Sequence, residues 1–501
     1  MITKRISVLL SGVFVLIQVG FANQVSINNK TEAESTADSK AACLTVRDFG
    51  AVGDGKADDT GAFQRAVDSG RGDILIPCGT YRLNETIEVD LDSTGPISIV
   101  GQGTARIIMT DAGPAFKLIG THNGTASPMT VKENVWRNQR MPIICGLEII
   151  GAHRQACGIE AVGTMHAVFS KILIRKALHG IHLTKRNRNV IISDCHIYKN
   201  RGIGIYLDHV NLHQINVGNS HISYNAGGGI VQKAGDVRNL QIGNCDIEAN
   251  MDEGSREAGS QKSPPAANVF IDATGGTIGE IAITGCTIQH SHSASDSANI
   301  RIIGKGLERD YAQGELRGGN IAITGNILSD VQVNIHLRSV RGITITGNTV
   351  WKGYLHDFLI EDSSGIVIGS NMFDRNPRYH YGDGESANRG LLFRNCNDCS
   401  LTGLQINNVW RKEGAISLEK CRRFNISGCG IINCDNAGIF MDDVESTIVT
   451  GCVVSDTRSE PGKTAAIIIR EGRGNFVSNN LFAGRMEIAP GSAKVENNLK
   501  K

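Results

Sequence analysis

Histidine, arginine and carboxylate side chains recur at matching positions of a repeated strand-like segment. Segments such as GIHLTK, GIYLDH and NIHLRS alternate β-branched residues or leucine with other types, which is typical of a strand with one buried face. If each segment adds one strand to the same sheet, the outward side chains form columns. The first outward column reads His182, Tyr206, Val231, Phe270, Arg301, His336, Leu359, Leu392, Ser417, Phe440 and Ile468. The second reads Thr184, Asp208, Lys233, Asp272, Ile303, Arg338, Glu361, Arg394, Glu419, Asp442 and Arg470.

The basic residues of these columns suit a lyase or epimerase that acts on uronic acid polymers. In such a reaction a base removes the proton beside the sugar carboxylate, and a cation must neutralise that carboxylate. Arg301 and Arg338 are the candidate cations, with His336 or Tyr379 as base or acid.

The acidic residues suit a glycoside hydrolase less well. A hydrolase needs two carboxylates about 5–5.5 Å or about 6.5–9.5 Å apart. Asp272 and Glu361 are the candidates, but several repeats separate them unless a loop carboxylate such as Asp383 intervenes. Asp208 with Asp272 meets the same difficulty.

Other residues of the same face are candidate sugar contacts rather than catalysts. These candidates are His182, Tyr206, Asp208, Lys233, Phe270, Tyr379, His380 and Tyr381. The simpler interpretation is a solvated face with cross-strand ion pairs of about 0.2–1 kcal/mol each, and it fits the alternating signs at Arg394, Glu419, Asp442 and Arg470. Insertions at 251–266, 306–319 and 374–389 leave from the middle repeats, where we expect them to wall a groove.

The elements that must position these residues repeat with a short period. IISDCHIYKN, NVGNSHISYN and QIGNCDIEAN align without gaps and end 25 residues apart. Further steps of 22 and 23 residues are too short for propeller blades of about 40–45 residues, so the period predicts a parallel β-helix with one coil per repeat. The 59 glycines among 501 residues supply its turns, and only 10 prolines exclude collagen.

One column of the repeat is small or polar and is expected to face the interior at a turn. It reads Cys195, Ser220, Cys245, Cys286, Asn326, Asn348, Asn371, Leu404, Cys429, Cys452 and Asn480. Identical polar residues in register can bond to the turn backbone and to one another. Cys396-x-x-Cys399 has the spacing of a zinc ligand pair but lacks a second pair, and Cys396 shares a column with Cys421, so packing or a disulfide is favoured and no metal site is predicted.

An opening segment precedes the repeats. It reads VRDFGAVGDGKADDTGAFQRAV over residues 46–67, followed by GDILIPCGTY and by Gly101-Gln102-Gly103. Asp58-Asp59-Thr60 is expected to cap a short helix that carries Phe63, Ala66 and Val67 on one face and covers the open end of the stack.

Over residues 44–103 this opening resembles the first coil of the pectate-lyase-like superfamily of right-handed β-helix proteins. The resemblance implies a right-handed helix and a carbohydrate substrate, in a group that holds pectin lyases and hydrolases, alginate epimerases and phage tailspike depolymerases. The GHG motif of polygalacturonase-like hydrolases is absent, and Tyr206-Leu207-Asp208-His209 matches the epimerase motif YGxDPH only in part. These departures leave the subfamily unassigned.

Composition and the N-terminus bear on location and partners. The 51 basic and 50 acidic residues give a net charge of +1, which offers no reason to expect nucleic acid as a partner. Lys4 and Arg5 precede an apolar run that ends in Gly20-Phe21-Ala22, as in a secretory signal peptide. We therefore expect a signal peptide at 1–22, a disordered leader at 23–43, a cap with first coils at 44–110, a β-helix at 111–490 and a tail at 491–501.

The sequence thus predicts an exported, all-β, right-handed parallel β-helix with a short N-terminal capping helix. We expect it to act on an acidic polysaccharide, with a β-eliminating lyase favoured over a polygalacturonase-like hydrolase and over a non-catalytic carbohydrate-binding or structural protein. No motif specifies a cofactor, and none specifies calcium.

Overall fold

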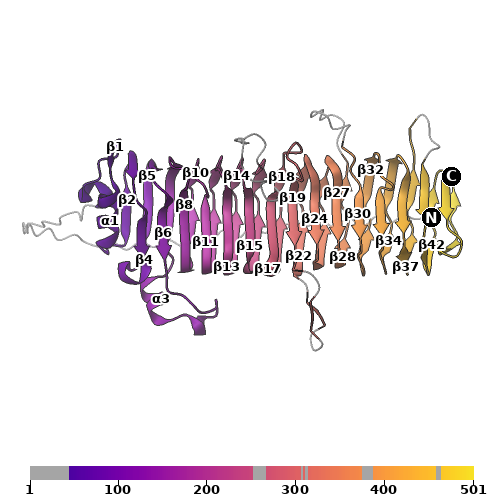
Figure 1. Ribbon diagram of the computed structural model, residues 1–501, viewed down its shortest axis with the longest axis horizontal. Helices are drawn as coiled ribbons and strands as arrows, with labels where there is room; N and C mark the ends of the chain where they lie inside the picture. Colours follow the sequence, from indigo (N-terminus) through magenta and orange to yellow (C-terminus); the bar gives the residue numbers. More distant parts are fainter. Residues whose placement is uncertain are drawn as a thin grey trace, which may run out of the picture. The chain divides into compact units, whose positions relative to one another are not determined.

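Along each strand, apolar residues that point inward alternate with residues that point outward. The strands form a stack of coils, which follow one another in sequence order (Figure 1). The computed structural model describes residues 44–251, 267–305, 318–374, 387–458 and 464–501, and the backbone of 308–310 and 314–316. One 42-stranded sheet holds almost all described strands, and its neighbouring coils pair in parallel. The expected right-handed parallel β-helix with a short capping helix is confirmed.

Each coil presents three faces. The first face, which carries the aligned columns, consists of β4 (Ile87–Asp90), β6 (Gly113–Ile119), β8 (Ala156–Met165), the first parts of β11 (Ile181–Ser193), β13 (Ile203–Gly218), β15 (Gly228–Gly243) and β17 (Ala267–Thr284), then β19 (Ala298–Ile303), β24 (Val331–Arg338), β27 (Gly353–Glu361), β30 (Leu391–Arg394), β33 (Ile416–Glu419), β36 (Ala437–Asp442), β40 (Ala465–Ile469) and β44 (Arg485–Ile488). Inward residues such as Ile181, Ile205 and Ile230 are at most 1% exposed and form the core.

The other two faces are built from shorter strands. The second face contains β2 (Asp73–Ile76), the first parts of β5 (Ser98–Met109) and β7 (Ile143–Gly151), β9 (Val168–Ser170), the later parts of β11, β13, β15 and β17, then β22 (Gly319–Thr324), β25 (Arg341–Thr346), β28 (Ser364–Ile368), β31 (Ser400–Thr402), β34 (Asn425–Ser427), β38 (Ile448–Thr450), β42 (Asn475–Ser478) and β45 (Ala493–Glu496). The third face contains β1 (Asp54–Asp58), β3 (Thr80–Leu83), the later parts of β5 and β7, β10 (Leu173–Arg175), β12 (His196–Tyr198), β14 (His221–Ser223), β16 (Asp246–Glu248), β18 (Thr287–Gln289), β23 (Ile327–Ser329), β26 (Thr349–Val350), β29 (Met372–Phe373), β32 (Gln405–Val409), β35 (Gly430–Cys434), β39 (Val453–Ser455), β43 (Leu481–Phe482) and β46 (Leu499–Lys500).

The interior polar column lies at the turn between the second and third faces, as the sequence predicts. Asn326 Nδ2 donates to Asn348 Oδ1 at 3.0 Å, and Asn348 Nδ2 donates to Asn371 Oδ1 at 2.9 Å. The cysteines of this column are buried, and each described cysteine of the chain is a free thiol. For Cys396 and Cys421 the structure therefore supports packing, not a disulfide.

A second asparagine ladder, which the sequence analysis missed, lies at the turn between the third and first faces. Its members are Asn200, Asn225, Asn250, Asn268, Asn299 and Asn334, each donating from Nδ2 to the Oδ1 of the next. The last amide donates to Asp357 Oδ1 at 3.1 Å, so a buried carboxylate ends the ladder.

The N-terminal end is capped by α1 (Thr60–Asp68), which buries Phe63, Ala66 and Val67 as expected. The capping contacts differ from those expected. Asp58 Oδ1 accepts from the Thr60 backbone N–H at 3.0 Å, whereas Asp59 does not cap the helix. Asp59 is buried and instead accepts from the Val52 N–H at 2.6 Å, which fixes the preceding loop.

Two segments depart from the expected boundaries. Residues 491–501 are not a tail, because β45 and β46 pair with β42 and β43 and add another coil, in which Asn498 extends the interior ladder from Asn480. An excursion at 121–142 carries η2 (Pro128–Thr130) and α3 (Glu133–Asn138) and lies beside β6 (Figure 1).

The remaining elements are small: η1 (Val46–Phe49), α2 (Leu91–Thr94) and the strand pairs β20 (Glu308–Asp310) with β21 (Gly314–Leu316) and β37 (Val444–Glu445) with β41 (Gly472–Arg473). The expected signal peptide and leader lie outside the described residues. In the part of the chain that the structure describes, no helix has the length and apolar character needed to cross a membrane.

Candidate functional site

The outward residues of the first face align in the predicted columns. His182 pairs in register with Tyr206, and the same register continues coil by coil through Arg301 and His336. The second column aligns likewise from Asp208 to Glu419. The strands therefore place the candidate residues on one face, and their contacts decide what each can do.

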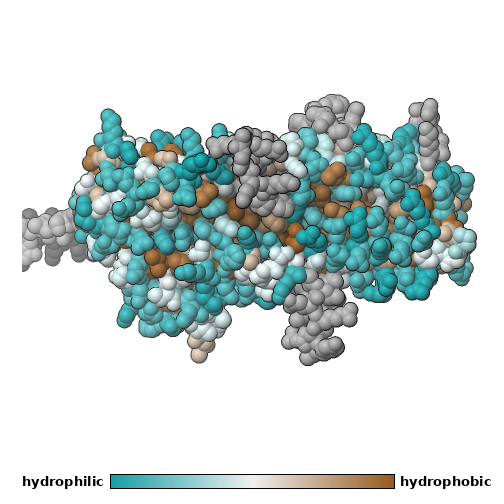
Figure 2. All heavy atoms as spheres, in the orientation of Figure 1, coloured by the Kyte–Doolittle hydropathy of each residue, from teal (hydrophilic) through white to brown (hydrophobic). Residues whose placement is uncertain are grey.

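The middle of the first column is covered rather than open. Phe270 is only 8% exposed and packs in an apolar cluster with Val231, Ala267, Ala298 and Ile303. Apolar surface also lies around the middle coils in Figure 2. The expectation that Phe270 offers an open ring to a sugar is wrong, because apolar neighbours in both columns enclose the ring.

A cluster of ionisable and aromatic groups lies at β11 and β13. The Tyr206 ring stacks on His182, with centroids 5.0 Å apart and planes at 6°, and His179 packs against Tyr206 at 5.0 Å. Burial, and then the nearby His182, lowers the pKa of His179 to about 4, so this imidazole is neutral. Its Nδ1 accepts from the Ile203 backbone N–H at 3.1 Å, which fixes the tautomer.

Asp208 is the centre of this cluster. Its Oδ2 lies 3.1 Å from His182 Nε2, and its Oδ1 lies 2.7 Å from His209 Nδ1. Burial alone would raise the pKa of Asp208, but hydrogen bonds from His209, His182 and Tyr206 together hold it below its usual range. Burial, followed by the Asp208 charge, raises the pKa of Tyr206, so the phenol keeps its proton.

The backbone explains why His209 reaches back to Asp208. His209 lies at the bend between the first two faces with φ of 47°, in the left-handed region, as do Lys185 and Ala234 at the same bend of the adjacent coils. The His209 side chain stays 65% exposed, so its Nε2 is open to solvent while Nδ1 faces Asp208. An imidazole oriented by a carboxylate in this way is a competent general base.

Two further features border the Asp208 cluster. Lys233 pairs in register with Asp208, is exposed and makes no ion pair with any described residue. The 121–142 excursion lies against the next part of β11, where Arg186 Nη2 donates to the Gly124 carbonyl at 2.6 Å. The cluster therefore has an unpaired cation beside it and an ordered excursion near its edge.

The residues expected to be catalytic in the middle coils form a closed network instead. Arg301 is 1% exposed, pairs with Asp296 Oδ1 at 2.9 Å and donates from Nε to His336 Nδ1 at 3.1 Å. His336 Nε2 lies 3.2 Å from Glu361 Oε2. Both ring nitrogens of His336 are thus engaged, and the Arg301 charge is already matched by a carboxylate.

Glu361 continues this network toward the C-terminal coils. Arg394 Nη1 contacts Glu361 Oε1 at 2.9 Å, and its Nε contacts Glu419 at 2.9 Å. Hydrogen bonding from His336, opposed by burial and aided by Arg394, holds the pKa of Glu361 below its usual range. The network is therefore a row of matched charges, as in the simpler interpretation of this face.

The other predicted catalytic residues are spread along the face. Arg338 is exposed and makes no ion pair with a described residue. Asp272 Oδ1 accepts from Thr274 N and Oγ1 at 3.1 and 2.6 Å, within its own turn. Asp272 and Glu361 are three register steps apart, about 14 Å at one strand spacing per step, which is too far for a hydrolase pair.

Some of the expected residues cannot be placed, and others were missed. Tyr379, His380, Tyr381 and Asp383 lie outside the described residues, as do most of the three expected loop insertions. His179 and His209 fall just outside the aligned columns and were not candidate site residues; His209 entered only through the partial match to an epimerase motif. The dipeptide Asp208-His209 at the end of a strand was the available signal for an oriented imidazole.

Two family descriptions match successive parts of the chain. Residues 43–256 match the family described as "Rhamnogalacturonase A/epimerase, pectate lyase-like", and residues 276–499 match "Periplasmic copper-binding protein (NosD)". No group of three or more His, Cys, Asp or Glu side chains among the described residues is arranged to hold a metal ion.

Curated relatives match a short segment. A mannuronan C5-epimerase, AlgE3 of Azotobacter vinelandii, is 37% identical over 73 residues, which are 13% of this chain and 4% of that protein. Alginate lyase 7 of the same organism is 39% identical over 71 residues, 13% of this chain and 8% of the relative. The chain thus aligns with only a small part of these relatives.

Solved structures match over most of the chain at low identity. The tailspike protein gp49 of Pseudomonas phage LKA1 has a TM-score of 0.47 and 14% identity, covering 90% of this chain and 84% of that one. The A-module of the mannuronan C5-epimerase AlgE4 of Azotobacter vinelandii has a TM-score of 0.37 and 13% identity, covering 90% and 99%. Residues 43–256, somewhat less than half of the chain, thus match a pectate-lyase-like family, and the fold is that of a right-handed parallel β-helix protein.

Proposed function

We propose that this protein is an exported enzyme that removes the proton beside the carboxylate of a uronic acid residue in an acidic polysaccharide, with the Asp208 cluster as its active site. The observation that carries the proposal is an exposed imidazole, His209, oriented by Asp208 and adjacent to Lys233, a cation that makes no ion pair with a described residue. The proposed chemistry thus lies outside the middle coils. Asp208, Tyr206 and Lys233 were expected to bind sugar, and His209 was not a candidate.

The roles follow from the contacts. The proton beside a sugar carboxylate becomes acidic enough to remove when a cation neutralises that carboxylate. Lys233, whose charge no described carboxylate matches, supplies that cation. His209 Nε2 takes the proton, because Asp208 accepts the Nδ1–H and stabilises the imidazolium that forms. Tyr206, which keeps its phenol proton, is the acid.

Two outcomes of this proton removal are chemically open. In β-elimination the electron pair forms a new C=C bond, the bond from carbon to the glycosidic oxygen breaks, and Tyr206 protonates the leaving oxygen. In epimerisation a proton returns to the opposite side of the same carbon and no bond is cleaved. The lyase reaction is the one we favour, and relatives whose names are mannuronan C5-epimerase and alginate lyase support a uronate substrate.

A panel of acidic and neutral polysaccharides tests the function. Purified protein is incubated with alginate, polygalacturonate, rhamnogalacturonan and a neutral glucan, and the ultraviolet absorbance of unsaturated uronate is followed with new reducing ends. Absorbance with reducing ends indicates a lyase, and deuterium uptake from D2O without either indicates an epimerase. Reducing ends alone would replace the proposal with a hydrolase, and binding without any turnover would replace it with a carbohydrate-binding protein.

Variants test the placement of the site. Asp208→Asn and His209→Gln should each lower kcat by about 100-fold or more with little change in thermal midpoint, because general base catalysis contributes about 10²–10⁴-fold. His221→Gln is the matched control, since His221 faces Asp246 at 3.5 Å on the third face. Wild-type turnover in both Asp208 and His209 variants would refute the assignment.

A further inference from the structure

A pocket of about 210 Å³ opens on the first face, far from the Asp208 cluster. Its wall includes Leu392 of β30 and Ser417 and Glu419 of β33, which belong to the two outward columns. The turn before β33 supplies Arg411, Lys412 and Glu413. The pocket therefore joins the surface on which a polysaccharide would lie.

The charges of the pocket do not cancel. Both acids are matched from outside it, because Glu413 contacts Arg470 at 3.3 Å and Glu419 contacts Arg394 at 2.9 Å. Arg411 and Lys412 make no ion pair with any described residue. Within the described residues the pocket thus presents two cations whose charge is unmatched, which favours an anionic ligand.

The surroundings of Lys412 also favour an anionic ligand. Burial lowers the pKa of Lys412, and the charge of Asp357 opposes the shift. His356, also in the wall, has its pKa lowered to about 3, first by burial and then by Lys412 and Arg394, so it is neutral. An incoming anion would relieve the cost of holding a partly buried ammonium group.

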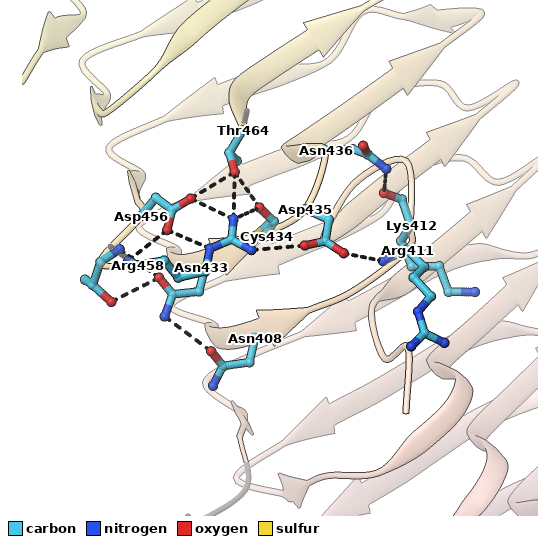
Figure 3. A network of polar contacts seen from close by, with 11 residues as sticks. Asn408, Arg411, Lys412, Asn433, Cys434, Asp435, Asn436, Asp456, Arg458 and Thr464 are labelled. Atoms are coloured by element: carbon cyan, nitrogen blue, oxygen red, sulfur yellow. Dashed lines mark hydrogen bonds and ion pairs between the residues drawn. The ribbon is translucent and has the colours of Figure 1, made fainter. Parts of the chain in front are cut away.

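The turn that carries these cations is held from the following coils (Figure 3). The Arg411 backbone N–H donates to Asp435 Oδ2 at 2.9 Å, and Asn436 Nδ2 donates to the Lys412 carbonyl at 2.6 Å. Asp435 is itself held by Arg458 at 3.0 Å. Only the backbone of the turn is used in these contacts, so the side chains of Arg411 and Lys412 stay available for a ligand.

Glycine is required where the turn meets the next coil. A Cβ at Gly414 would lie 2.7 Å from Phe440 Cβ and 2.9 Å from the Ile416 carbonyl oxygen. The turn therefore lies too close to β33 and β36 for any side chain at this position. Such a fixed turn presents a preformed site rather than one that must be ordered on binding.

We propose that this pocket binds a carboxylated sugar residue of the same acidic polysaccharide, as a subsite remote from the Asp208 cluster. Arg411 and Lys412 bind the carboxylate, Ser417 and Asn436 face the sugar hydroxyls, and Leu392 contacts the apolar side of the ring. Seven register steps separate Asp208 from Glu419, which is about 34 Å at one strand spacing per step. Only a chain of several sugars reaches both sites, so this inference rests on the proposed function for its substrate.

Binding measurements test the pocket without requiring turnover. Calorimetry measures the Kd of wild type, Lys412→Gln and Lys420→Gln for polygalacturonate and mannuronate oligosaccharides, for polymers of each, for a neutral glucan and for inorganic phosphate. Lys420 is an exposed lysine outside the pocket and serves as the matched control. We expect Lys412→Gln to weaken polymer binding about tenfold or more, because one charge-assisted hydrogen bond is lost, with no change for Lys420→Gln.

Each outcome decides the matter. Unchanged polymer affinity in Lys412→Gln, or equal binding of the neutral glucan, would overturn the subsite, and so would tight phosphate binding without polymer binding. Asp208→Asn separates the two proposals, since it should abolish turnover while leaving the Lys412-dependent binding intact. If turnover survives Asp208→Asn but Lys412→Gln still weakens binding, the active site assignment fails and the subsite stands.

Discussion

Asp357→Asn should stabilise this protein at neutral pH. Asp357 is fully buried at the end of the asparagine ladder, where its Oδ1 accepts from Asn334 Nδ2 and from the Gly353 N–H, both at 3.1 Å. Its Oδ2 has no hydrogen-bond partner among the described residues. In the repeat of the ladder, Asp357 Oδ2 lies where each asparagine has its side-chain amide nitrogen. In Asn334 that nitrogen also donates to the Trp351 carbonyl. A charged carboxylate oxygen is thus buried with no donor among the described residues, and a neutral side chain removes that cost.

The magnitude follows from the pKa of this carboxyl. Burial raises the pKa of Asp357 to about 6 from its ordinary value of 3.8, although Arg389 and Asn334 act in the opposite direction. The native state therefore keeps a proton that the unfolded chain has lost, and stability falls as the pH rises from about 4 to about 6. A difference of about 2 units corresponds to about 3 kcal/mol at pH 7, which the neutral asparagine removes.

Urea denaturation followed by circular dichroism at pH 4, 5, 6 and 7 measures the effect. The variant should match the parent near pH 4 and exceed it by about 3 kcal/mol at pH 7. Asp330→Asn is the control of opposite sign, because Asp330 lies 3.1 Å from the buried Lys352 and its loss leaves that cation without the carboxylate. A variant that is no more stable at pH 7, or a difference that does not change with pH, would refute the reasoning.

Three further predictions concern the ladder, the cap and the central network. Asn348→Ala should cost about 2–5 kcal/mol in urea denaturation, because the buried amides of Asn326 and Asn371 each lose a partner; a cost below 1 kcal/mol would contradict the ladder's role. Asp59→Ala should raise amide hydrogen exchange at residues 52–53, since it removes the acceptor of the Val52 N–H, and unchanged exchange would show that the loop is held otherwise. Arg301→Met should lower the thermal midpoint by several degrees yet leave KM unchanged, since Arg301 is buried and paired, and a raised KM at constant midpoint would restore it as a substrate contact.

The columns of the first face were predictable because strict alternation and an apolar anchor in each coil fix which residues point outward. The solvent exposure of those residues was not predictable, because it depends on contacts made by other coils. Phe270 and Arg301 point outward and are nevertheless buried. The role of His209 was hidden for a different reason: its side chain is aimed by a left-handed bend, which strand alternation does not describe.

The excursion at 121–142 and the last coil show a second limit. The excursion lacks the repeated pattern, although the 23 residues between β6 and β7 are long for a plain turn. The last coil does carry it, because VENNL at 495–499 matches VSNNL at 477–481, and this match was overlooked. The polar column of the repeat, in contrast, was recognised from side-chain identity alone. Asparagines in register carry their own bonding partners, so their structural role can be deduced before any coordinates are known.

The two asparagine ladders have a consequence for cooperativity. One ladder ends at Asp357, and the other passes from Asn371 to Leu404, which has no amide to continue it. Both interruptions fall between the coil of β27 to β29 and the coil of β30 to β32, so the stack has a seam there. We expect the coils on either side to unfold as separate blocks. The Asp208 cluster lies on one side of this seam, and the Lys412 pocket spans it, because His356 of β27 lines the pocket together with residues of the following coils. A long polysaccharide bound at the Asp208 cluster and at the Lys412 pocket would therefore link the two blocks.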